Sequence, residues 1–281
     1  MAQAIHPFDQ AIALTAAGPD TWSGHTSAAY WNMIGPFGGI TAATVLRAVL
    51  QDPRCLGTPV ALTVNYVAAL QAGPFTVTAR AARTNRSTQH WVVEITQDDD
   101  DAKAGVVLTA TVMTALRRDT WGVNDTPMPQ VPQPQNVSAP PWRSPIEWIK
   151  RYEVLQLQGP LPHEWDDVVS TRGFEDASLS RLWMRDAPQR PIDYCALAAL
   201  ADVFYPRIYL RRTSRVPAGT VSMTVYFHAD DAMLGAVGDG YVLGQARAHA
   251  FHAGFHDQSA QLWSASGVLL ATSHQLVYYK Q

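Results

Sequence analysis

The sequence lacks the features that mark several specialised classes of protein. Only 16% of its 281 residues are charged and the formal net charge is −3, so there is no basic surplus to bind nucleic acid or an acidic membrane surface. No run of 18 apolar residues occurs, and we expect no membrane-spanning helix. The first residues, MAQAIHPFDQAIAL, carry an early acid and no Lys or Arg, which is untypical of a signal peptide.

Cysteine is scarce, and three common enzyme motifs are missing. Cys55 and Cys195 form no C-x-x-C pair and lie in or beside apolar segments, so we interpret them as reduced thiols of a cytoplasmic protein. The sequence contains no G-x-S-x-G, no G-x-G-x-x-G and no G-x-x-x-x-G-K. These absences disfavour a serine hydrolase, a dinucleotide-dependent enzyme and a nucleoside triphosphatase.

Proline, by contrast, is concentrated in one segment. Residues 121–145 hold seven prolines, and such a segment cannot continue a helix or a central strand. Because it is long for an internal loop, we interpret it as a linker between two units. The predicted division is an N-terminal unit at 1–120, the linker at 121–145 and a C-terminal unit at 146–281.

The two units resemble each other in sequence. ALTVNYVA at 61–68 matches SMTVYFHA at 222–229 with an offset of 161 residues, and AGVVLTAT matches SGVLLATS with an offset of 162. Alternation of apolar and polar residues predicts strands in both units. The predicted strands are 59–69, 73–84, 87–97 and 104–116 in the first unit and 219–229, 240–250, 256–264 and 267–279 in the second. Further strands are expected earlier, at 9–16, 25–32 and 172–185.

Each unit also contains one strongly apolar helix, predicted over 38–51 and 193–206. A helix that is apolar on nearly all sides must be buried, and within one unit only a sheet curled around it can bury it. We therefore predict an α+β fold in which a long antiparallel sheet wraps around a central helix, made twice. The acidic run QDDDDAK at 97–103 is interpreted as a solvated hairpin tip, with a cation site as the less favoured alternative.

This pattern resembles the double-hotdog acyl-CoA thioesterases of the TesB-like (thioesterase II) family. The resemblance covers nearly the whole chain: G-P-F-G-G at 35–39 with its helix, the two strand sets, the proline-rich segment and a last strand containing Ser-His-Gln. It implies a double hotdog fold and hydrolysis of an acyl-CoA to the free acid and CoA, with no cofactor and no metal ion. The unpaired edge strands favour a homodimer or a larger homo-oligomer.

Asp202 is the most informative single residue, because it is the only charge in the apolar segment 194–206. Burial makes a carboxylate costly to ionise, so its pKa should rise toward a value useful to a general base. The resembled family pairs such an Asp with a Thr at the start of the next strand and a Gln near the end of the last strand. The matching residues are Thr220 and Gln275, and the three would hold and activate a water molecule.

The first unit lacks this equipment, since Arg47 aligns with Asp202 and a position near Met113 aligns with Gln275. We therefore predict one active site per chain. Gly38 and Gly39 open the helix of the first unit and leave its first N–H groups bare, so they are candidates to polarise the thioester carbonyl. The alternative is that the two glycines only allow a tight turn.

Two other functions remain open. Hotdog dehydratases and hydratases use an Asp and a His five positions apart, and Asp20 with His25 is the only such pair here, in a turn-rich segment without the expected helix behind it. An acyl-CoA-binding protein that has lost catalysis is the other alternative, and binding without turnover would reveal it.

The remaining chemistry-bearing residues are assigned to structure. His249 and His252 would lie on opposite faces of a strand, which is a poor arrangement for one metal ion. We expect them on the surface or in loops. Trp91, Trp183 and Trp263 are expected to fill core or interface space.

Overall fold

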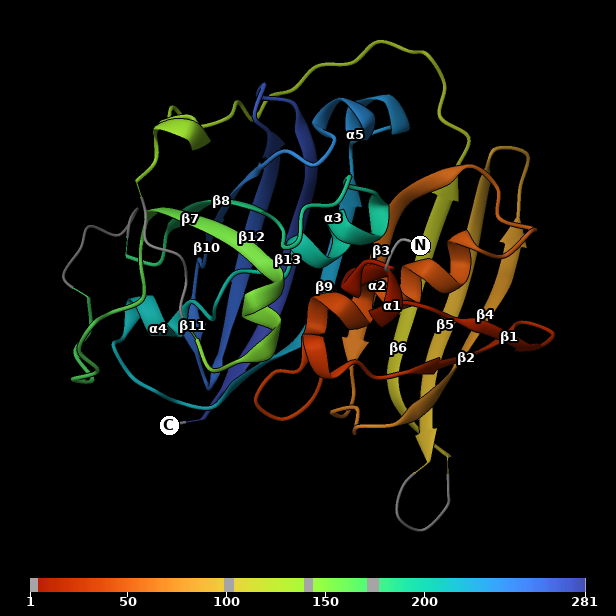
Figure 1. The fold of residues 1–281 in the computed structure, drawn as a ribbon, viewed down its shortest axis with the longest axis horizontal. Helices are drawn as coiled ribbons and strands as arrows, with labels where there is room; N and C mark the ends of the chain where they lie inside the picture. Colours follow the sequence, from red (N-terminus) through yellow and green to blue (C-terminus); the bar gives the residue numbers. More distant parts are fainter. Residues whose placement is uncertain (1–4, 99–103, 139–143, 171–176, 281) are drawn as a thin grey trace.

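One long antiparallel sheet forms the frame of the molecule (Figure 1). The structure is a computed structural model that describes residues 5–98, 104–138, 144–170 and 177–280. Within these ranges, thirteen strands form the sheet. Twelve follow one path in the order β1-β2-β4-β5-β6-β3-β9-β13-β12-β10-β8-β7, and β11 pairs with β12 beside it.

The first half supplies six of these strands and the longest described helix, α2 (Gly38–Leu50). The strands are β1 (Thr15–Gly18), β2 (Thr21–His25), β3 (Thr58–Tyr66), β4 (Pro74–Thr84), β5 (Thr88–Asp98) and β6 (Ala104–Ala115). Two short helical segments, α1 (Pro7–Ala11) and η1 (Ala28–Tyr30), precede α2. All four strands predicted after the helix are therefore present.

The second half supplies the other seven strands and the helix α3 (Tyr194–Leu200). The strands are β7 (Tyr152–Gln158), β8 (Ser180–Asp186), β9 (Ala218–Phe227), β10 (Val242–Arg247), β11 (Phe251–His252), β12 (Phe255–Ser264) and β13 (Leu269–Tyr279). The remaining short helices are η2 (Pro134–Asn136), η3 (Glu147–Arg151), α4 (Ile208–Arg211) and α5 (Asp231–Val237). The four strands predicted after α3 are present, and β7 was not predicted.

Three predicted elements are wrong in extent or type. Residues 9–16 were expected to form a strand, but Pro7 at the first helical position and the His6 side chain, which accepts from Phe8 N–H, begin helix α1 there. The strand predicted over 25–32 lies earlier, at β2, which includes only His25 of that range, and η1 follows it. The helix predicted over 193–206 ends at Leu200, where tighter turn bonds follow from Asp202 N–H to Ala199 O and from Val203 N–H to Leu200 O.

The two halves join edge to edge at the centre of the sheet. Strands β3 and β9 are antiparallel neighbours, and Thr63 pairs with Thr224, 161 residues later in the chain. Their hydroxyl oxygens lie 3.0 Å apart. Since 161 is also the offset of the internal repeat, each strand here pairs with its own repeat equivalent, and a local two-fold axis passes between them.

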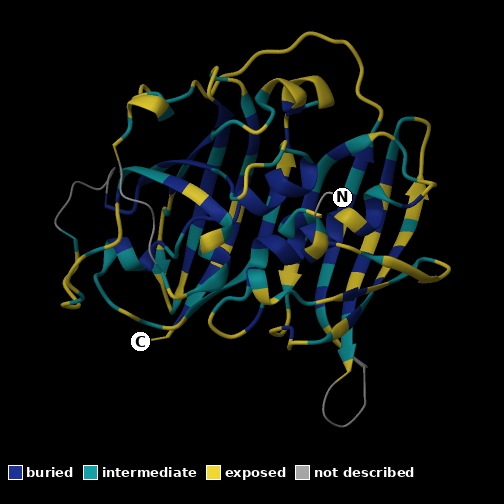
Figure 2. Ribbon diagram, viewed as in Figure 1, coloured by how far each residue is buried: buried dark blue, intermediate teal, exposed yellow. Residues whose placement is uncertain are grey.

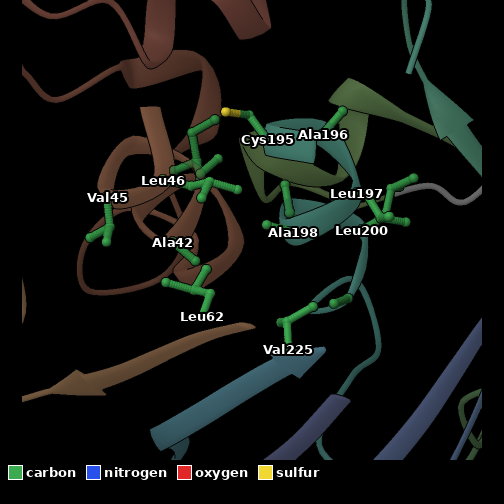
Figure 3. Packing of buried hydrophobic residues seen from close by; sticks show 14 of the residues in the cluster. Ala42, Val45, Leu46, Leu62, Cys195, Ala196, Leu197, Ala198, Leu200 and Val225 are labelled. Carbon is green, nitrogen blue, oxygen red and sulfur yellow. The ribbon is translucent and has the colours of Figure 1, made fainter. Parts of the chain in front are cut away.

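The two central helices pack against each other inside the curled sheet. Figure 2 shows both as buried, with the sheet around them. Ala42, Leu46 and Val45 of α2 and Ala198 and Leu197 of α3 are fully buried. In Figure 3 the sulfur of Cys195 points from α3 toward α2. Neither described cysteine forms a disulfide, and Cys195 is buried whereas Cys55 is half-buried.

Residues 126–137 of the proline-rich segment lie against the outer face of the second half of the sheet. Trp183 and Trp263 are fully buried there, and their indole N–H groups donate to Pro132 O at 2.9 Å and Thr126 O at 3.0 Å. Trp91 is buried in the main core. The three tryptophans therefore fill core and internal interface space, as predicted. The division at 1–120, 121–145 and 146–281 stays a prediction.

Two further predictions concern the surface. Residues 99–103 of the acidic run lie outside the described residues, while Asp98 of β5 pairs with Ala104 of β6 on either side of them. None of the helices in the described part of the chain has the length and apolar character that a membrane crossing requires.

Candidate active site

Asp202 lies two residues beyond the end of α3, where the chain leaves the central helix pair. Its own N–H donates to Ala199 O at 3.1 Å, which continues the last turn and holds the side chain at the helix end. Only 8% of the residue is exposed. The apolar segment around it thus places a carboxyl group in the interior, as the sequence predicted.

The carboxyl group of Asp202 is held by two donors from different parts of the chain. Gln275 Nε2 on β13 donates to Asp202 Oδ1 at 2.9 Å, and the N–H of Gly39 at the start of α2 donates to the same carboxyl group. Burial raises the pKa of Asp202 to about 7, against the smaller lowering effect of these two hydrogen bonds. At neutral pH the group can therefore exchange a proton, as a general base must.

Thr220 reaches this site because of a β-bulge. Strict alternation along β9 places it on the face opposite Met223, yet its hydroxyl donates to Gln275 Oε1 at 3.2 Å. The register shifts between β9 and β13, so that Ser222 pairs with Leu276 while Thr220 pairs with Val277. One β9 residue, Val221, thus has no partner on β13 between those pairs, and this bulge turns Thr220 to the inner face.

The start of α2 completes the site from the other half of the molecule. A Cβ at Gly38 would lie 2.7 Å from Asp202 Oδ2, so only glycine leaves room for the carboxyl group here. A Cβ at Gly39 would lie 2.6 Å from Ala199 O, at the contact between the two helices. Both glycines therefore permit close approach, and Gly39 N–H is already used by Asp202.

Tyr66 is a site residue that sequence reasoning missed. Its hydroxyl, at the end of β3, donates to Gly38 O at 2.9 Å. Burial and the nearby charge of Asp202 hold its pKa well above the usual range, so it is a neutral donor. Burial and several negative groups, Asp202 among them, likewise raise the pKa of Tyr152 on β7. In the sequence, the only signal for Tyr66 is an aromatic residue at the end of a predicted strand.

The register of the strands identifies the equivalent positions in the first half. β3 pairs with β6 as β9 pairs with β13, so Val112 occupies the place of Gln275 and Pro59 that of Thr220. The sequence alignment indicated a position near Met113, and the strand register specifies it as Val112. Neither Val112 nor Pro59 can orient a water molecule through its side chain.

The helices extend this comparison to Asp202. Their N-cap residues are Phe37 for α2 and Asp193 for α3. Aligned at these caps, Leu46 takes the place of Asp202, beside the Arg47 expected from the sequence. Leu46 is fully buried in the apolar core, so the first half has no equivalent of the carboxyl group.

The same alignment shows what fills the corresponding space in the first half. Tyr194 stands where α2 has Gly38, and Phe227 stands where β3 has Tyr66. The rings of Tyr194 and Phe227 pack edge to face with centroids 5.9 Å apart. A large side chain therefore occupies the position that glycine keeps open at Asp202, and the described chain equips only one of its two pseudo-equivalent positions.

Other sequence candidates are not brought together. Asp20 is ion-paired with Arg54, while His25 lies at the other end of β2 and contacts Thr26 O. His249 is exposed and pairs with Asp257, and His252 is exposed as well. Across the described ranges no group of three or more His, Cys, Asp or Glu side chains is arranged to hold a metal ion.

Comparison with protein-family models shows to which family the chain belongs. The model of the acyl-CoA thioesterase N-terminal domain matches residues 27–115, and that of the C-terminal domain matches residues 124–279. The chain belongs to the acyl-CoA thioesterase family. No curated protein matches it in sequence.

Solved structures similar to this acyl-CoA thioesterase family member confirm the double hotdog fold. A conserved protein of unknown function with a hot dog fold from Alicyclobacillus acidocaldarius is 43% identical, with 99% of each chain covered and a TM-score of 0.89. The acyl-CoA thioesterase II TesB2 from Mycobacterium marinum is 16% identical over 97% of this chain and 98% of its own, with a TM-score of 0.71. The tesB protein of Mycobacterium avium subsp. paratuberculosis is 14% identical over 98% of each chain, with a TM-score of 0.74.

Proposed function

We propose that this family member hydrolyses an acyl-CoA thioester with a water molecule activated by Asp202. The observation that carries the proposal is the hydrogen-bonded row Thr220–Gln275–Asp202, which ends at a buried carboxyl group with a pKa of about 7. A thioester needs no covalent nucleophile, because its carbonyl is already activated. General-base catalysis by one carboxylate is then sufficient.

Asp202, Gln275 and Thr220 have different roles in the proposed reaction. Ionised Asp202 accepts a proton from the water as its oxygen attacks the thioester carbonyl, and a tetrahedral oxyanion forms. The C–S bond then breaks, the free acid is released, and the CoA sulfur takes the proton back from Asp202. The Thr220 hydroxyl donates a hydrogen bond to Gln275 Oε1, which orients the amide so that its nitrogen faces Asp202. The Thr220 oxygen keeps lone pairs that can accept from the water.

The start of α2 supplies the electrostatic support. Because Gly39 N–H donates to Asp202, it is not free to donate to the oxyanion. The proposed donors to the oxyanion are therefore Gly38 N–H and the positive end of the helix. Because α2 belongs to the first half and Asp202 to the second, each half contributes part of the proposed site.

Release of CoA from short, long and aromatic acyl-CoAs tests the proposal. We expect Asp202→Asn to lower kcat by about 10² to 10⁴ while the protein stays folded. Asp52→Asn is the matched control, because Asp52 is also a buried carboxyl group but lies beyond the far end of α2, about 20 Å from Gly38 along the helix. Full activity of Asp202→Asn would refute the mechanism, and binding of acyl-CoA without turnover by the wild type would identify a binding protein instead.

We further propose that the protein acts in the cytoplasm as a homodimer or larger homo-oligomer. The sheet ends in two edge strands, β1 and β7, and every residue of β1 is exposed. Light scattering after size-exclusion chromatography would measure the mass, and a monomer at micromolar concentration would contradict the oligomer.

A further inference from the structure

Strand β12 carries two polar side chains on the inner face of the sheet, next to the proposed site. Gln258 and His256 are 2% and 1% exposed and, being two residues apart on one strand, face the same side. Gln258 pairs directly with Gln275 across β12 and β13. Its side chain thus starts about one strand spacing, roughly 4.8 Å, from the row that holds Asp202.

Each of these side chains has one buried nitrogen without a hydrogen-bond partner among the described residues. Gln258 Nε2 is a donor with no acceptor, and His256 Nε2 is likewise unpartnered. His256 Nδ1 lies 3.0 Å from Asp257 O, and since a carbonyl can only accept, Nδ1 carries the proton. Burial lowers the pKa of His256 to about 4, so the ring is neutral at pH 7 and its Nε2 is an acceptor.

In the first half, the side chains at the two equivalent positions find all their hydrogen-bond partners within the protein. By strand register, Trp91 corresponds to Gln258 and Gln89 to His256. Gln89 Oε1 accepts from Trp91 Nε1 at 3.1 Å and from Leu56 N–H at 2.8 Å, and its Nε2 donates to Arg54 O and to a threonine hydroxyl. Every polar atom of that pair is used internally.

Buried polar atoms are rarely left unpaired, and here a donor and an acceptor lie two residues apart on one face of β12, in the half that holds the proposed base. Building on the proposed thioesterase function, we infer that the substrate's acyl group carries a hydroxyl that accepts from Gln258 Nε2 and donates to His256 Nε2. Among the groups that an acyl chain commonly carries, a hydroxyl is one that both donates and accepts a hydrogen bond. Gln258 and His256 are then specificity-determining residues that touch the acyl group a few carbon atoms beyond the thioester carbonyl.

Matched pairs of substrates test this inference kinetically. We would compare hexanoyl-CoA with its hydroxylated forms at the third, fourth and fifth carbons, and phenylacetyl-CoA with 4-hydroxyphenylacetyl-CoA. The wild type should prefer the best hydroxylated member of at least one pair by tenfold or more in kcat/KM, because a site built around a hydroxyl rejects the analogue that lacks it. The aliphatic and aromatic arms show which kind of hydroxyl fits.

Three variants show whether these two residues cause the preference. Gln258→Leu removes the donor, and His256→Phe removes the acceptor but keeps an aromatic ring between Phe251 and Tyr279, whose centroids lie 5.3 and 6.1 Å from that of His256. Both should reduce the preference below threefold. Gln261→Leu, on the opposite face of the same strand, should keep it.

A binding measurement separates the inference from the function on which it rests. Calorimetry with Asp202→Asn, in which the proposed mechanism slows turnover by about 10² to 10⁴, should show tenfold tighter binding of the hydroxylated acyl-CoA. Equal binding and equal kcat/KM within every pair would overturn the inference, as would a preference that survives in both Gln258→Leu and His256→Phe. If no acyl-CoA is hydrolysed at all, the thioesterase proposal fails, while the binding ratio still decides whether the hydroxyl site exists.

Discussion

The hydrogen bond from Gln275 to Asp202 makes a quantitative prediction about pH dependence. Gln275 Nε2 donates to Asp202 Oδ1 at 2.9 Å, which stabilises the ionised form and lowers the pKa of Asp202. The resulting pKa is still about 7, because the effect of burial is larger than that of the hydrogen bond. A hydrogen bond to a charged group contributes about 1.5–3 kcal/mol, and one pKa unit corresponds to about 1.4 kcal/mol. In Gln275→Leu we therefore expect the pKa of Asp202 to rise by roughly one to two units.

The rate of CoA release as a function of pH measures this shift. Since ionised Asp202 is the proposed base, kcat/KM of the wild type should rise with pH through a midpoint of about 7. The midpoint of Gln275→Leu should lie at about 8 to 9, with a lower plateau because the water is also less well oriented. Thr220→Val, which removes only the bond to Gln275 Oε1 at 3.2 Å, should move the midpoint by less than about one unit.

The position of the midpoint, and not the plateau, is the decisive quantity. Gln261→Leu serves as the control for loss of a glutamine on the neighbouring strand, and its profile should match that of the wild type. A Gln275→Leu enzyme with reduced activity but an unchanged midpoint would show that the base is another group. A midpoint displaced toward acid would show that Gln275 stabilises the protonated form, contrary to the geometry.

Three other predictions concern stability and packing. The pKa of Asp202 is about 7 in the folded protein and ordinarily 3.8, so the unfolding free energy of the wild type should fall by on the order of 4 kcal/mol as the pH rises from 4 to 8. Asp202→Asn should not show this fall, and urea denaturation at each pH measures it. Gly38→Ala should lower kcat with little change in Tm, whereas Gly39→Ala, which meets Ala199 O, should lower Tm. Trp263→Ala should cost about 3–5 kcal/mol and expose the proline-rich segment to protease.

The fold could be predicted because local pattern and global arrangement agree in most of the chain. Strands β3 to β6 and their second-half equivalents alternate clearly, and the internal repeat doubles the evidence for each. The exceptions are segments where a local device overrides the pattern. At the N-terminus, Pro7 and the His6 cap start a helix inside an apolar stretch that alternation alone favours as a strand. β7 was missed because it follows the proline-rich segment and a short helix without a turn signal.

The residue types of the site could be predicted from the sequence, but the contacts between their side chains could not. Asp202 could be found because a lone charge in an apolar helix segment requires an explanation. Thr220 faced the wrong way in the alternation, and only the bulge in the pairing of β9 with β13 brings it to Gln275. The role inferred for Gln258 could not be found from the sequence, because it depends on which residue lies across the strand boundary and which atoms remain unpaired.

The comparison of the two halves explains why the chain has one proposed site. Burying a carboxyl group is costly unless donors face it, and Asp202 has one donor from its own half, Gln275 Nε2, and one from the start of α2 in the other half, Gly39 N–H. The pseudo-equivalent place holds Leu46, so it needs no such donors and is closed by Tyr194 and Phe227. The buried carboxyl group and the glycine beside it therefore occur together: Gly38 leaves room for Asp202, whereas the rings of Tyr194 and Phe227 fill the equivalent space where no carboxyl group is present.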